Sequence, residues 1–450
     1  MEPGRRKGDV VATRASAVLA AIAAGAAAVL VLWWHSTRAI AGPGGFLTTV
    51  GEGLGLLAGY AVIIAVLLMA RLPPVERGVG ADRLARWHAT VGRWTIGLIC
   101  GHVLFIIWGY ALQAHSGLVS ETGTLLTTYP DVLMATVAWF LLLGVALTSM
   151  RAVRTRLRYE TWYYLHFYTY VAAALAVSHQ FTNGAAFTAD TAVRLWWGAL
   201  YLVTATLLFR YRFVLPAYAF ARHRLRVAGV RDEGNRTVSV YIRGRRLGEL
   251  GTAPGQFFRW RFLARGLWWQ SHPYSLSALP SDDLMRITVR DVGDPTNPLR
   301  SLRPGTRVIA EGPFGAFTPG RSALAADRSA RPVLLVAGGV GITPLRTMLA
   351  ALAGQVTLIY RASSWPDVVF KDELDALASA RGGQVHYVVG ARSELGTDPL
   401  SASALRDLVP ALCAVDAYVC GPPGMLAAAV TALADAGVAR RRIHAESFEF

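Results

Sequence analysis

The chain has 450 residues, of which 53% are hydrophobic and 16% are charged. A composition this apolar is typical of a membrane protein, and the length leaves room for two or three domains. The formal net charge of +16 would suit nucleic-acid binding, but the positive residues are nearly all arginines and many of them flank apolar stretches. That pattern is typical of membrane topology, so we exclude nucleic acid as a partner.

Six apolar stretches approach the roughly 20 residues that a transmembrane helix requires. They lie at residues 17–34, 51–70, 87–110, 132–150, 162–180 and 192–213. A cleaved signal peptide is the alternative for the first stretch, which is long for that role and has a poor cleavage context at residues 32–35. The pattern predicts a six-helix transmembrane bundle.

Arginines indicate how this bundle is oriented. They concentrate between the second and third stretches, between the fourth and fifth, and after the sixth, whereas the other loops are poor in basic residues apart from Arg38. Positive residues stay on the cytoplasmic side, so both termini are expected to be cytoplasmic. The third and fifth stretches then run outward in parallel.

These two parallel stretches each carry two histidines near opposite ends. His88 and His102 are 14 residues apart, and His166 and His179 are 13 apart. Each spacing corresponds to about 20 Å of helix, so the expected pairs are His88 with His166 near the cytoplasmic face and His102 with His179 near the outer face. Such pairs suit the axial ligation of two stacked b-type haems. The alternative is core histidines satisfied by their neighbours.

One of the two spacings does not fit an ideal helix. Fourteen residues return to nearly the same helix face, whereas thirteen miss it by about 140°. The fifth stretch is therefore expected to be distorted locally, or His166 approaches from the end of a helix. Cys100, Cys413 and Cys420 form no CxxCH motif, no CxxC pair and no iron–sulfur spacing. Any haem is thus expected to be held noncovalently, and structural disulfides are not expected.

From about residue 225 the apolar pattern changes. Short alternating stretches separated by glycine and proline, such as residues 237–243 and 286–290, predict a small antiparallel barrel. From residue 332, apolar strands alternate with helical stretches, which predicts a doubly wound parallel sheet.

A glycine-rich turn follows the first strand of this predicted sheet. Its glycines would let the backbone approach a pyrophosphate at a helix N-terminus. Arg361 ends the next strand, where an acidic residue would bind the ribose of NADH, so we expect NADPH with NADH as the alternative. A solvated arginine is the other interpretation. The expected nucleotide-binding residues are Gly338, Gly339, Gly341, Thr343, Arg361 and Ser363.

Five motifs in the second half occur in an order that resembles the ferredoxin–NADP reductase family. They are His272-Pro-Tyr-Ser275, Glu311-Gly-Pro-Phe-Gly315, the Gly338 turn, Cys420-Gly-Pro-Pro-Gly424 and the tail Glu446-Ser-Phe-Glu-Phe450. Together with the bis-histidine bundle, residues of about 50–450 resemble the ferric reductase / NADPH oxidase superfamily in a bacterial form.

The resemblance implies how FAD is bound. His272, Pro273, Tyr274 and Ser275 match the flavin motif: Tyr274 would flank the isoalloxazine ring and the Ser275 hydroxyl would face flavin N5. The soluble reductases usually have arginine where His272 stands. A second phosphate-binding segment and the glycines near it are implied at Arg290, Gly293, Thr296, Gly312 and Gly315.

The resemblance also implies the nicotinamide site and the domain limits. Cys420 and Glu446 would lie beside the nicotinamide, Gly421 is expected to bind a cofactor, and Phe448 or Phe450 would cover the flavin. The implied domains are a cytoplasmic N-terminus at 1–16, a six-span haem-binding domain at 17–215, an FAD-binding barrel at 222–322 and an NADPH-binding domain at 330–450. The membrane is expected to be the bacterial inner (plasma) membrane.

The expected activity follows from the cofactors. NADPH delivers two electrons as hydride, a haem accepts one, and a flavin links the two kinds of transfer. We expect an oxidoreductase that passes electrons from NADPH through FAD and two haems to an external acceptor, with ferric chelates first and dioxygen, reduced to superoxide, second. A donor subunit for a periplasmic redox partner or quinone is another alternative. A haem-bearing scaffold without turnover is disfavoured by the intact nucleotide motifs.

Overall fold

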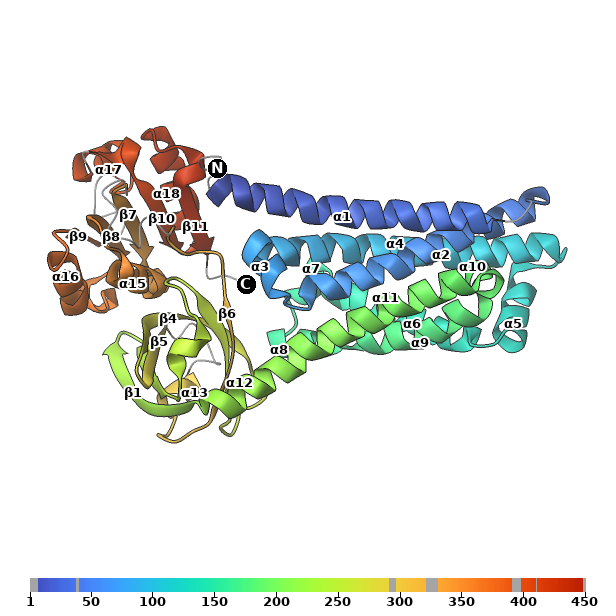
Figure 1. Ribbon diagram of the computed structural model, residues 1–450, viewed down its shortest axis with the longest axis horizontal. Coiled ribbons are helices and arrows are strands. Elements are labelled where there is room, and N and C mark those ends of the chain that lie inside the picture. The colour runs from blue at the N-terminus through green and yellow to red at the C-terminus, as the bar shows by residue number, and fades with distance from the viewer. Residues whose placement is uncertain are drawn as a thin grey trace. The chain divides into compact units, whose positions relative to one another are not determined.

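The computed structural model describes residues 7–37, 40–290, 297–320, 331–390, 398–409 and 411–447. It divides into two compact units: Thr13–Val214, and Leu215–Phe450 together with Met1–Ala12 (Figure 1). In the described residues of the first unit, the regular elements are all helices. The second contains both sheets.

The helical unit consists of apolar helices joined by short connections. Its helices are α1 Lys7–Ser36, α2 Gly42–Met69, α3 Pro73–Val79, α4 Ala81–Gln113, α5 Leu118–Thr128, α6 Val132–Ser149, α7 Arg151–Arg154, α8 Tyr159–His166, α9 Tyr168–Asn183, α10 Ala185–Ala189 and α11 Thr191–Phe209, followed by a π-helical turn at Arg210–Val214. Small residues bring α2 and α4 close together: a Cβ at Gly51 would lie 3.0 Å from the Ile106 side chain.

The predicted six-helix count is not confirmed. In the described part of the chain, five helices are long and apolar enough to cross a membrane: Ala15–Ser36, Gly42–Met69, Arg83–Gln113, Val132–Ser149 and Thr191–His223. The predicted span at 162–180 is divided into α8 and α9, and neither piece reaches the length of a span.

The interruption between α8 and α9 lies at Phe167, directly after His166. The Phe167 amide donates to the Tyr164 carbonyl at 3.1 Å, and the Tyr170 amide donates to the Phe167 carbonyl at 3.0 Å. Both bonds span three residues and tighten the turn relative to an α-helix. The structure therefore has a local distortion of the kind that the 13-residue histidine spacing requires.

The antiparallel domain predicted from alternating strands is present. It begins with α12 (Leu215–His223), includes the short α13 (Asn297–Arg300), and has six antiparallel strands in the order β1-β2-β5-β4-β3-β6. The strands are β1 Arg226–Gly234, β2 Thr237–Arg243, β3 Phe257–Phe262, β4 His272–Ser281, β5 Leu284–Arg290 and β6 Val308–Phe314. The start of β1 pairs with the segment that leads into β6, at Arg226 and Arg307, so the sheet closes on itself. Buried Phe258, Trp260 and Ile287 belong to its core.

The predicted parallel sheet is also confirmed. Its five strands, in the order β11-β10-β7-β8-β9, are β7 Val333–Gly338, β8 Val356–Ala362, β9 Gln384–Val389, β10 Asp416–Gly421 and β11 Ile443–Ser447. Its helices are α15 Ile342–Ala351, α16 Lys371–Ser379, α17 Ala402–Leu408 and α18 Pro423–Asp435. The strand order changes direction between β7 and β10, and doubly wound sheets bind ligands at the carboxyl ends of such strands.

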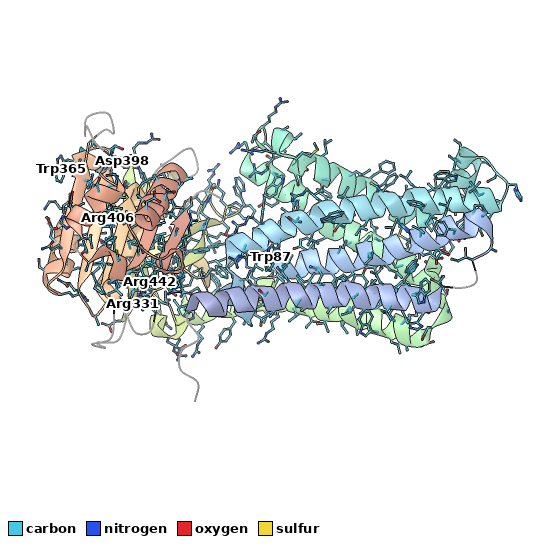
Figure 2. The ribbon with its side chains drawn as sticks, turned by 90° about the horizontal axis from the view of Figure 1, so that it is seen from above. Trp87, Arg331, Trp365, Asp398, Arg406 and Arg442 are labelled. Carbon is cyan, nitrogen blue, oxygen red and sulfur yellow. The ribbon has the colours of Figure 1, made fainter. Side chains whose placement is uncertain are left out.

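Two apolar cores cover the two faces of this sheet. One contains residues of α15 and α16, and the other contains residues of α17 and α18. Two arginines, labelled in Figure 2, link segments of the layer that contains α17 and α18. Arg406 donates to the Asp435 carbonyl at 2.8 Å, and Arg442 donates to the Cys413 carbonyl at 3.0 Å. These bonds satisfy carbonyls at the ends of helical segments.

Candidate functional site

The helical unit brings the four predicted histidines together in the two predicted pairs. The ring centres of His88 and His166 are 5.8 Å apart, and those of His102 and His179 are 6.4 Å apart. His88 and His102 lie on the same continuous helix, α4, so the two pairs are separated by about 21 Å along its axis.

Both spacings suit a metal ion held between two imidazoles. A metal–nitrogen bond of about 2 Å on each side, plus about 1.2 Å from each ring nitrogen to its ring centre, places two ligand rings about 6.4 Å apart. In the described residues, no group of three or more His, Cys, Asp or Glu side chains could hold a metal ion. The spacings of the two histidine pairs would themselves fit two-imidazole ligation of a haem iron.

Backbone carbonyls of α2 fix the tautomer of the two α4 histidines. Nδ1 of His88 donates to the Ala65 carbonyl at 3.0 Å, and Nδ1 of His102 donates to the Gly51 carbonyl at 2.8 Å. With the proton on Nδ1, the lone pair of Nε2 is free to bind a metal. The two acceptors are 14 residues apart on α2, the same spacing as the histidines on α4.

The partner histidines have different surroundings. Nδ1 of His166 is buried and has no hydrogen-bond partner in the described part of the chain. Nδ1 of His179 lies 3.2 Å from the side-chain amide nitrogen, Nδ2, of Asn183. A backbone carbonyl therefore fixes the tautomer of His88 and of His102, the two histidines of α4, but not that of their partners in the described residues.

Two further residues contact the histidine pairs: Gly55 lies against His102, and Trp162 lies against His166. A Cβ at Gly55 would lie 2.7 Å from Nδ1 of His102, so only glycine leaves that imidazole in place. The Trp162 ring centre lies 5.3 Å from that of His166, and the Arg154 guanidinium lies 4.5 Å above the Trp162 ring. Sequence reasoning missed both residues, although Gly51, Gly55 and Gly59 form a Gly-x-x-x-Gly series, a known signal for close helix packing.

In the barrel, the predicted flavin motif lies at the start of β4. Ser275 is buried, and its hydroxyl has no hydrogen-bond partner in the described residues. The rings of His272 and Tyr274 stack with centres 5.8 Å apart, and Pro273 pairs with Arg259 of β3. A buried hydroxyl without a partner costs free energy, so Ser275 fits a site where a bound group completes the hydrogen bond.

Gly312 of β6 and Gly315, directly after β6, face aromatic side chains of β3. A Cβ at Gly312 would lie 2.7 Å from the Phe258 ring, and one at Gly315 would lie 3.2 Å from the Phe257 ring. The structure therefore gives both glycines a packing role within the barrel. The predicted contacts at Gly293 and Thr296 lie outside the described residues.

Arg290, predicted to bind a flavin phosphate, forms an ion pair with the nucleotide-binding domain. Its guanidinium donates to Asp367 at 2.6 Å, and the Asp367 side chain is only 6% exposed. Asp367 also accepts from Ser364 at 2.8 Å and from Asn235. A phosphate at Arg290 would therefore share this guanidinium with Asp367, a residue that sequence reasoning missed.

The glycine-rich turn lies between β7 and α15, as predicted. A Cβ at Gly341 would lie 2.2 Å from the Cys420 carbonyl oxygen, and a Cβ at Gly421 would lie 3.1 Å from Cα of Gly338, so these glycines bring the ends of β7 and β10 together. Gly339 has a φ of +52°. The Thr343 hydroxyl donates to the Val340 carbonyl at 3.0 Å within the first turn of α15.

Cys420 and Glu446 are neighbours on adjacent strands, in register across β10 and β11. Burial raises the pKa of the Cys420 thiol well above its usual value, and the Glu446 carboxylate raises it further. The thiol is therefore protonated at neutral pH and is not a thiolate nucleophile. Phe448 and Phe450 lie outside the described residues.

Arg361, which is predicted to bind the 2′-phosphate of NADPH, makes several contacts with backbone carbonyls. The Arg361 guanidinium donates to the carbonyls of Gly390 at 2.6 Å and Val388 at 3.2 Å, and to that of Ala362. Ser363 is exposed directly after β8. Arg361 would therefore have to exchange some of these carbonyls for a phosphate when a nucleotide binds.

A buried charge network, not anticipated from the sequence, joins the two domains of this unit. Arg286 of β5 is 6% exposed and donates twice to Glu373 of α16, at 2.8 Å each, and Arg346 of α15 donates to the same carboxylate at 3.0 Å. The hydrogen bond from Arg286 is the main cause that lowers the pKa of Glu373 to about 2. The barrel and the parallel sheet are thereby linked through three ionised side chains.

The order of domains in the chain matches known families. Residues 54–177 match the family described as ferric reductase like transmembrane component, residues 226–318 match an FAD-binding domain, and residues 335–431 match the oxidoreductase NAD-binding domain. These matches define a membrane domain fused to a flavin- and NAD(P)-binding reductase module. The chain has the ferric reductase / NADPH oxidase-type architecture.

Curated relatives resemble the reductase module. The ferredoxin reductase component of 3-ketosteroid-9-alpha-monooxygenase from Mycobacterium tuberculosis is 34% identical over 205 residues, which cover 44% of this chain and 55% of the relative. The toluate 1,2-dioxygenase electron transfer component of Pseudomonas putida is 28% identical over 239 residues, or 51% of this chain and 68% of the relative. An NADPH oxidoreductase of Mycobacterium tuberculosis is 29% identical over 244 residues, or 52% of this chain and 62% of the relative.

Among solved structures, the ferredoxin reductase in carbazole 1,9a-dioxygenase is 22% identical, with a TM-score of 0.42, over 50% of this chain and 69% of that one. The chain spans little more than half the length of the first curated relatives that it matches. The domains and the oxidoreductase relatives support the class of NAD(P)H-dependent oxidoreductases.

Proposed function

We propose that the protein carries electrons across a membrane, from NADPH through FAD and two b-type haems to an acceptor on the other side. When bound, the nicotinamide supplies hydride, the flavin converts two-electron to one-electron transfer, and the haems carry single electrons. The observation that carries this proposal is the pair of two-imidazole sites, about 21 Å apart on α4, in the same chain as a flavin- and nucleotide-binding module.

In this proposal His88, His166, His102 and His179 are axial ligands, and the carbonyls of α2 keep Nε2 of the α4 pair free for the iron. With two imidazoles on each iron, no position would be left for an acceptor, so the haems would supply one-electron transfer without binding the acceptor at iron. Ser275 is proposed to hold the flavin near N5.

The nucleotide-binding residues are proposed to work at the carboxyl ends of β7 and β10. There Gly338, Gly339 and Gly341 admit the pyrophosphate, and Cys420 and Glu446 flank the nicotinamide. We propose NADPH as the donor, a preference supported by Arg361 and by the likeness to an NADPH oxidoreductase. NADH remains the alternative donor.

The proposed acceptor is a ferric chelate, supported by the description of the family that residues 54–177 match. Arginine-rich loops support cytoplasmic termini in a multi-pass protein of the bacterial inner membrane. We propose domain limits of 17–215 for the membrane part, 222–322 for the flavin part and 330–450 for the nucleotide part.

The test is an anaerobic visible spectrum of the FAD-loaded full chain before and after NADPH. We expect ferric-haem bands to shift to a reduced b-type spectrum, and addition of ferric chelate and then oxygen to rank the acceptors. Flavin bleaching without any haem signal would contradict the proposal and leave a membrane-anchored flavin reductase.

A variant pair sharpens this test. His102→Ala should halve the haem content while NADPH still bleaches the flavin. The matched control is His115→Ala, because His115 is exposed and lies beyond the end of α4. Equal haem content in the two variants would refute the ligand assignment.

A further inference from the structure

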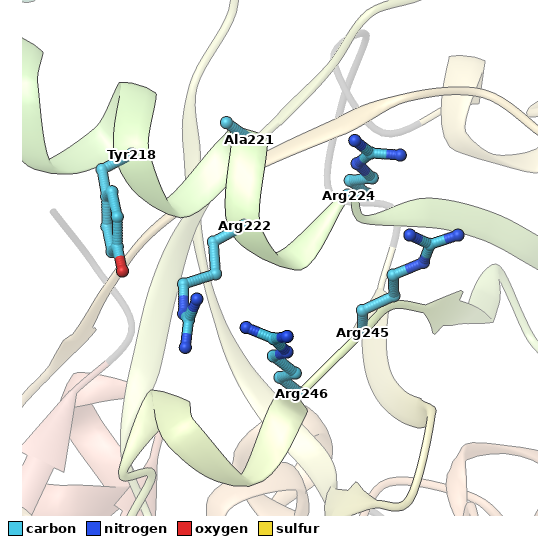
Figure 3. A pocket seen from close by; sticks show the side chains of 6 residues that line it. All are labelled: Tyr218, Ala221, Arg222, Arg224, Arg245 and Arg246. Atoms are coloured by element: carbon cyan, nitrogen blue, oxygen red, sulfur yellow. The ribbon is translucent and has the colours of Figure 1, made fainter.

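Four arginines and a tyrosine surround a hollow that the electron route does not use. The hollow has a volume of about 340 Å³, lies beside α12, and is lined by Tyr218, Ala221, Arg222, Arg224, Arg245 and Arg246 (Figure 3). In Figure 3, the guanidinium group of Arg246 extends toward that of Arg222. Like charges gathered in one concave site repel each other, and a bound anion would relieve that repulsion.

Most of this positive charge is not neutralised by the protein. Arg222 forms a two-point ion pair with Glu249, at 2.7 and 3.0 Å. In the described part of the chain, Arg224, Arg245 and Arg246 form no ion pair with a carboxylate within 4.0 Å. One carboxylate therefore faces four guanidinium groups, which leaves a net charge of about +3 on the wall of the hollow.

Hydrogen bonds hold the backbone around the hollow in place. The Arg245 amide donates to the His223 carbonyl at 2.8 Å, and the buried His223 ring returns a bond to the Arg245 carbonyl at 3.0 Å. Arg224 and Arg246 have φ values of +46° and +54°, in the left-handed region that disfavours residues with a Cβ. Backbone strain of this kind persists where surrounding contacts impose it, and it recurs at ligand clamps.

The place of the hollow in the chain indicates the kind of anion. The helix Thr191–His223 is one of the five that are long and apolar enough to span a membrane, and its last turns carry Tyr218 and Arg222. Clustered arginines directly after a spanning helix attract anionic headgroups, and tyrosine is enriched at the membrane interface. Guanidinium groups also match the geometry of a phosphate.

We propose that this arginine pocket binds the phosphate of an anionic phospholipid headgroup. The ligand chemistry, a phosphate ester, is shared by soluble phosphates, and the position at the end of a spanning helix favours the lipid. The proposal is independent of the electron route, because none of the lining residues belongs to the flavin, nucleotide or histidine sites.

The test is native mass spectrometry of the full chain in detergent, titrated with dioctanoyl-phosphatidylglycerol, with dioctanoyl-phosphatidylcholine as the neutral lipid. We expect selective retention of phosphatidylglycerol. The double variant Arg245→Gln/Arg246→Gln should weaken its binding about thirtyfold, the loss expected for two arginines near a membrane surface.

Two further variants keep the test independent of folding defects. Arg231→Gln/Arg440→Gln removes the same charge from exposed positions elsewhere in this unit, and should bind the lipid as the wild type does. Glu249→Gln releases Arg222 from its ion pair and should tighten binding. Equal affinity in the two double variants, or no gain in Glu249→Gln, would overturn the proposal.

Glycerol 3-phosphate distinguishes the two sources of phosphate. We expect it to bind far more weakly than phosphatidylglycerol. If it bound as tightly and with the same dependence on Arg245 and Arg246, the pocket would belong to a soluble phosphate ester, and the lipid assignment would be wrong.

Discussion

Replacing Gly55 by alanine should displace the outer histidine pair. The new Cβ would lie 2.7 Å from Nδ1 of His102, whereas ordinary contact begins at 3.4 Å. The imidazole would have to move by about 0.7 Å, away from a position fixed by its 2.8 Å bond to the Gly51 carbonyl. Disturbing such a supporting contact typically costs 10- to 100-fold in metal affinity, so the outer haem should be partly or wholly lost.

The assay is the ratio of haem to protein by pyridine haemochrome, together with the low-temperature electron paramagnetic resonance spectrum. We expect the ratio to fall from two toward one and one low-spin signal to shift or vanish. Alanine is the better helix former by about 1 kcal/mol, so a loss of haem would not reflect a weaker α2.

The matched control is Gly97→Ala on α4, where a Cβ meets nothing within 4 Å. It should keep two haems and both signals. If Gly55→Ala also kept two haems with unchanged signals, His102 would not hold a haem in the position described above, and the reasoning would be refuted.

Three other predictions concern the unit that contains both sheets. Ser275→Ala should slow flavin reduction by NADPH at least tenfold in stopped-flow absorbance while haem content is retained, and an unchanged rate would show that its buried hydroxyl does not face flavin N5. Arg361→Ala should narrow the ratio of kcat/KM for NADPH over NADH, so an unaltered ratio would refute its contact with the 2′-phosphate. Glu373 has a pKa of about 2 in the folded protein, whereas its ordinary value is 4.5. Its contribution to folding stability is therefore fully present above about pH 4.5 and is lost as the pH falls through 2. Because the carboxylate is 37% exposed and therefore partly screened by solvent, we expect Glu373 to contribute about 1–2 kcal/mol to the free energy of unfolding. In scanning calorimetry, the unfolding temperature of the unit that contains both sheets should fall more between pH 5 and 2.5 in the wild type than in Glu373→Gln, and parallel profiles would contradict the assignment.

Features that follow from periodicity were predictable from the sequence. The pairing of His88 with His166 and of His102 with His179 depends only on depth along two helices, and depth follows from counting residues. Several strands of both sheets were recognisable because alternation and continuous apolar runs distinguish half-buried from fully buried strands, whereas β4, β6 and β11 were not predicted as strands.

Features that depend on contacts between distant segments were not predictable. The ion pair of Arg290 with Asp367 joins residues 77 apart, and the Arg286–Glu373 pair joins residues 87 apart. Neither partner carries a local signal, because a single charged residue after a strand or on a helix is usually solvated. The division of the predicted fifth span at Phe167 was anticipated only as a geometric necessity, since no proline or glycine marks it.

The closure of the barrel determines when the unit that contains both sheets can fold during synthesis. Arg226 at the start of β1 pairs with Arg307, 81 residues later, and β7 pairs with β10 across a comparable interval. At about 5–20 residues per second, the ribosome needs roughly 4–16 s to supply the second partner of each pair. Helices such as α4 form from local contacts alone and are complete much earlier. During this interval one edge of β1 and one edge of β7 stay unpaired, and an unpaired strand edge exposes the nascent chain to aggregation.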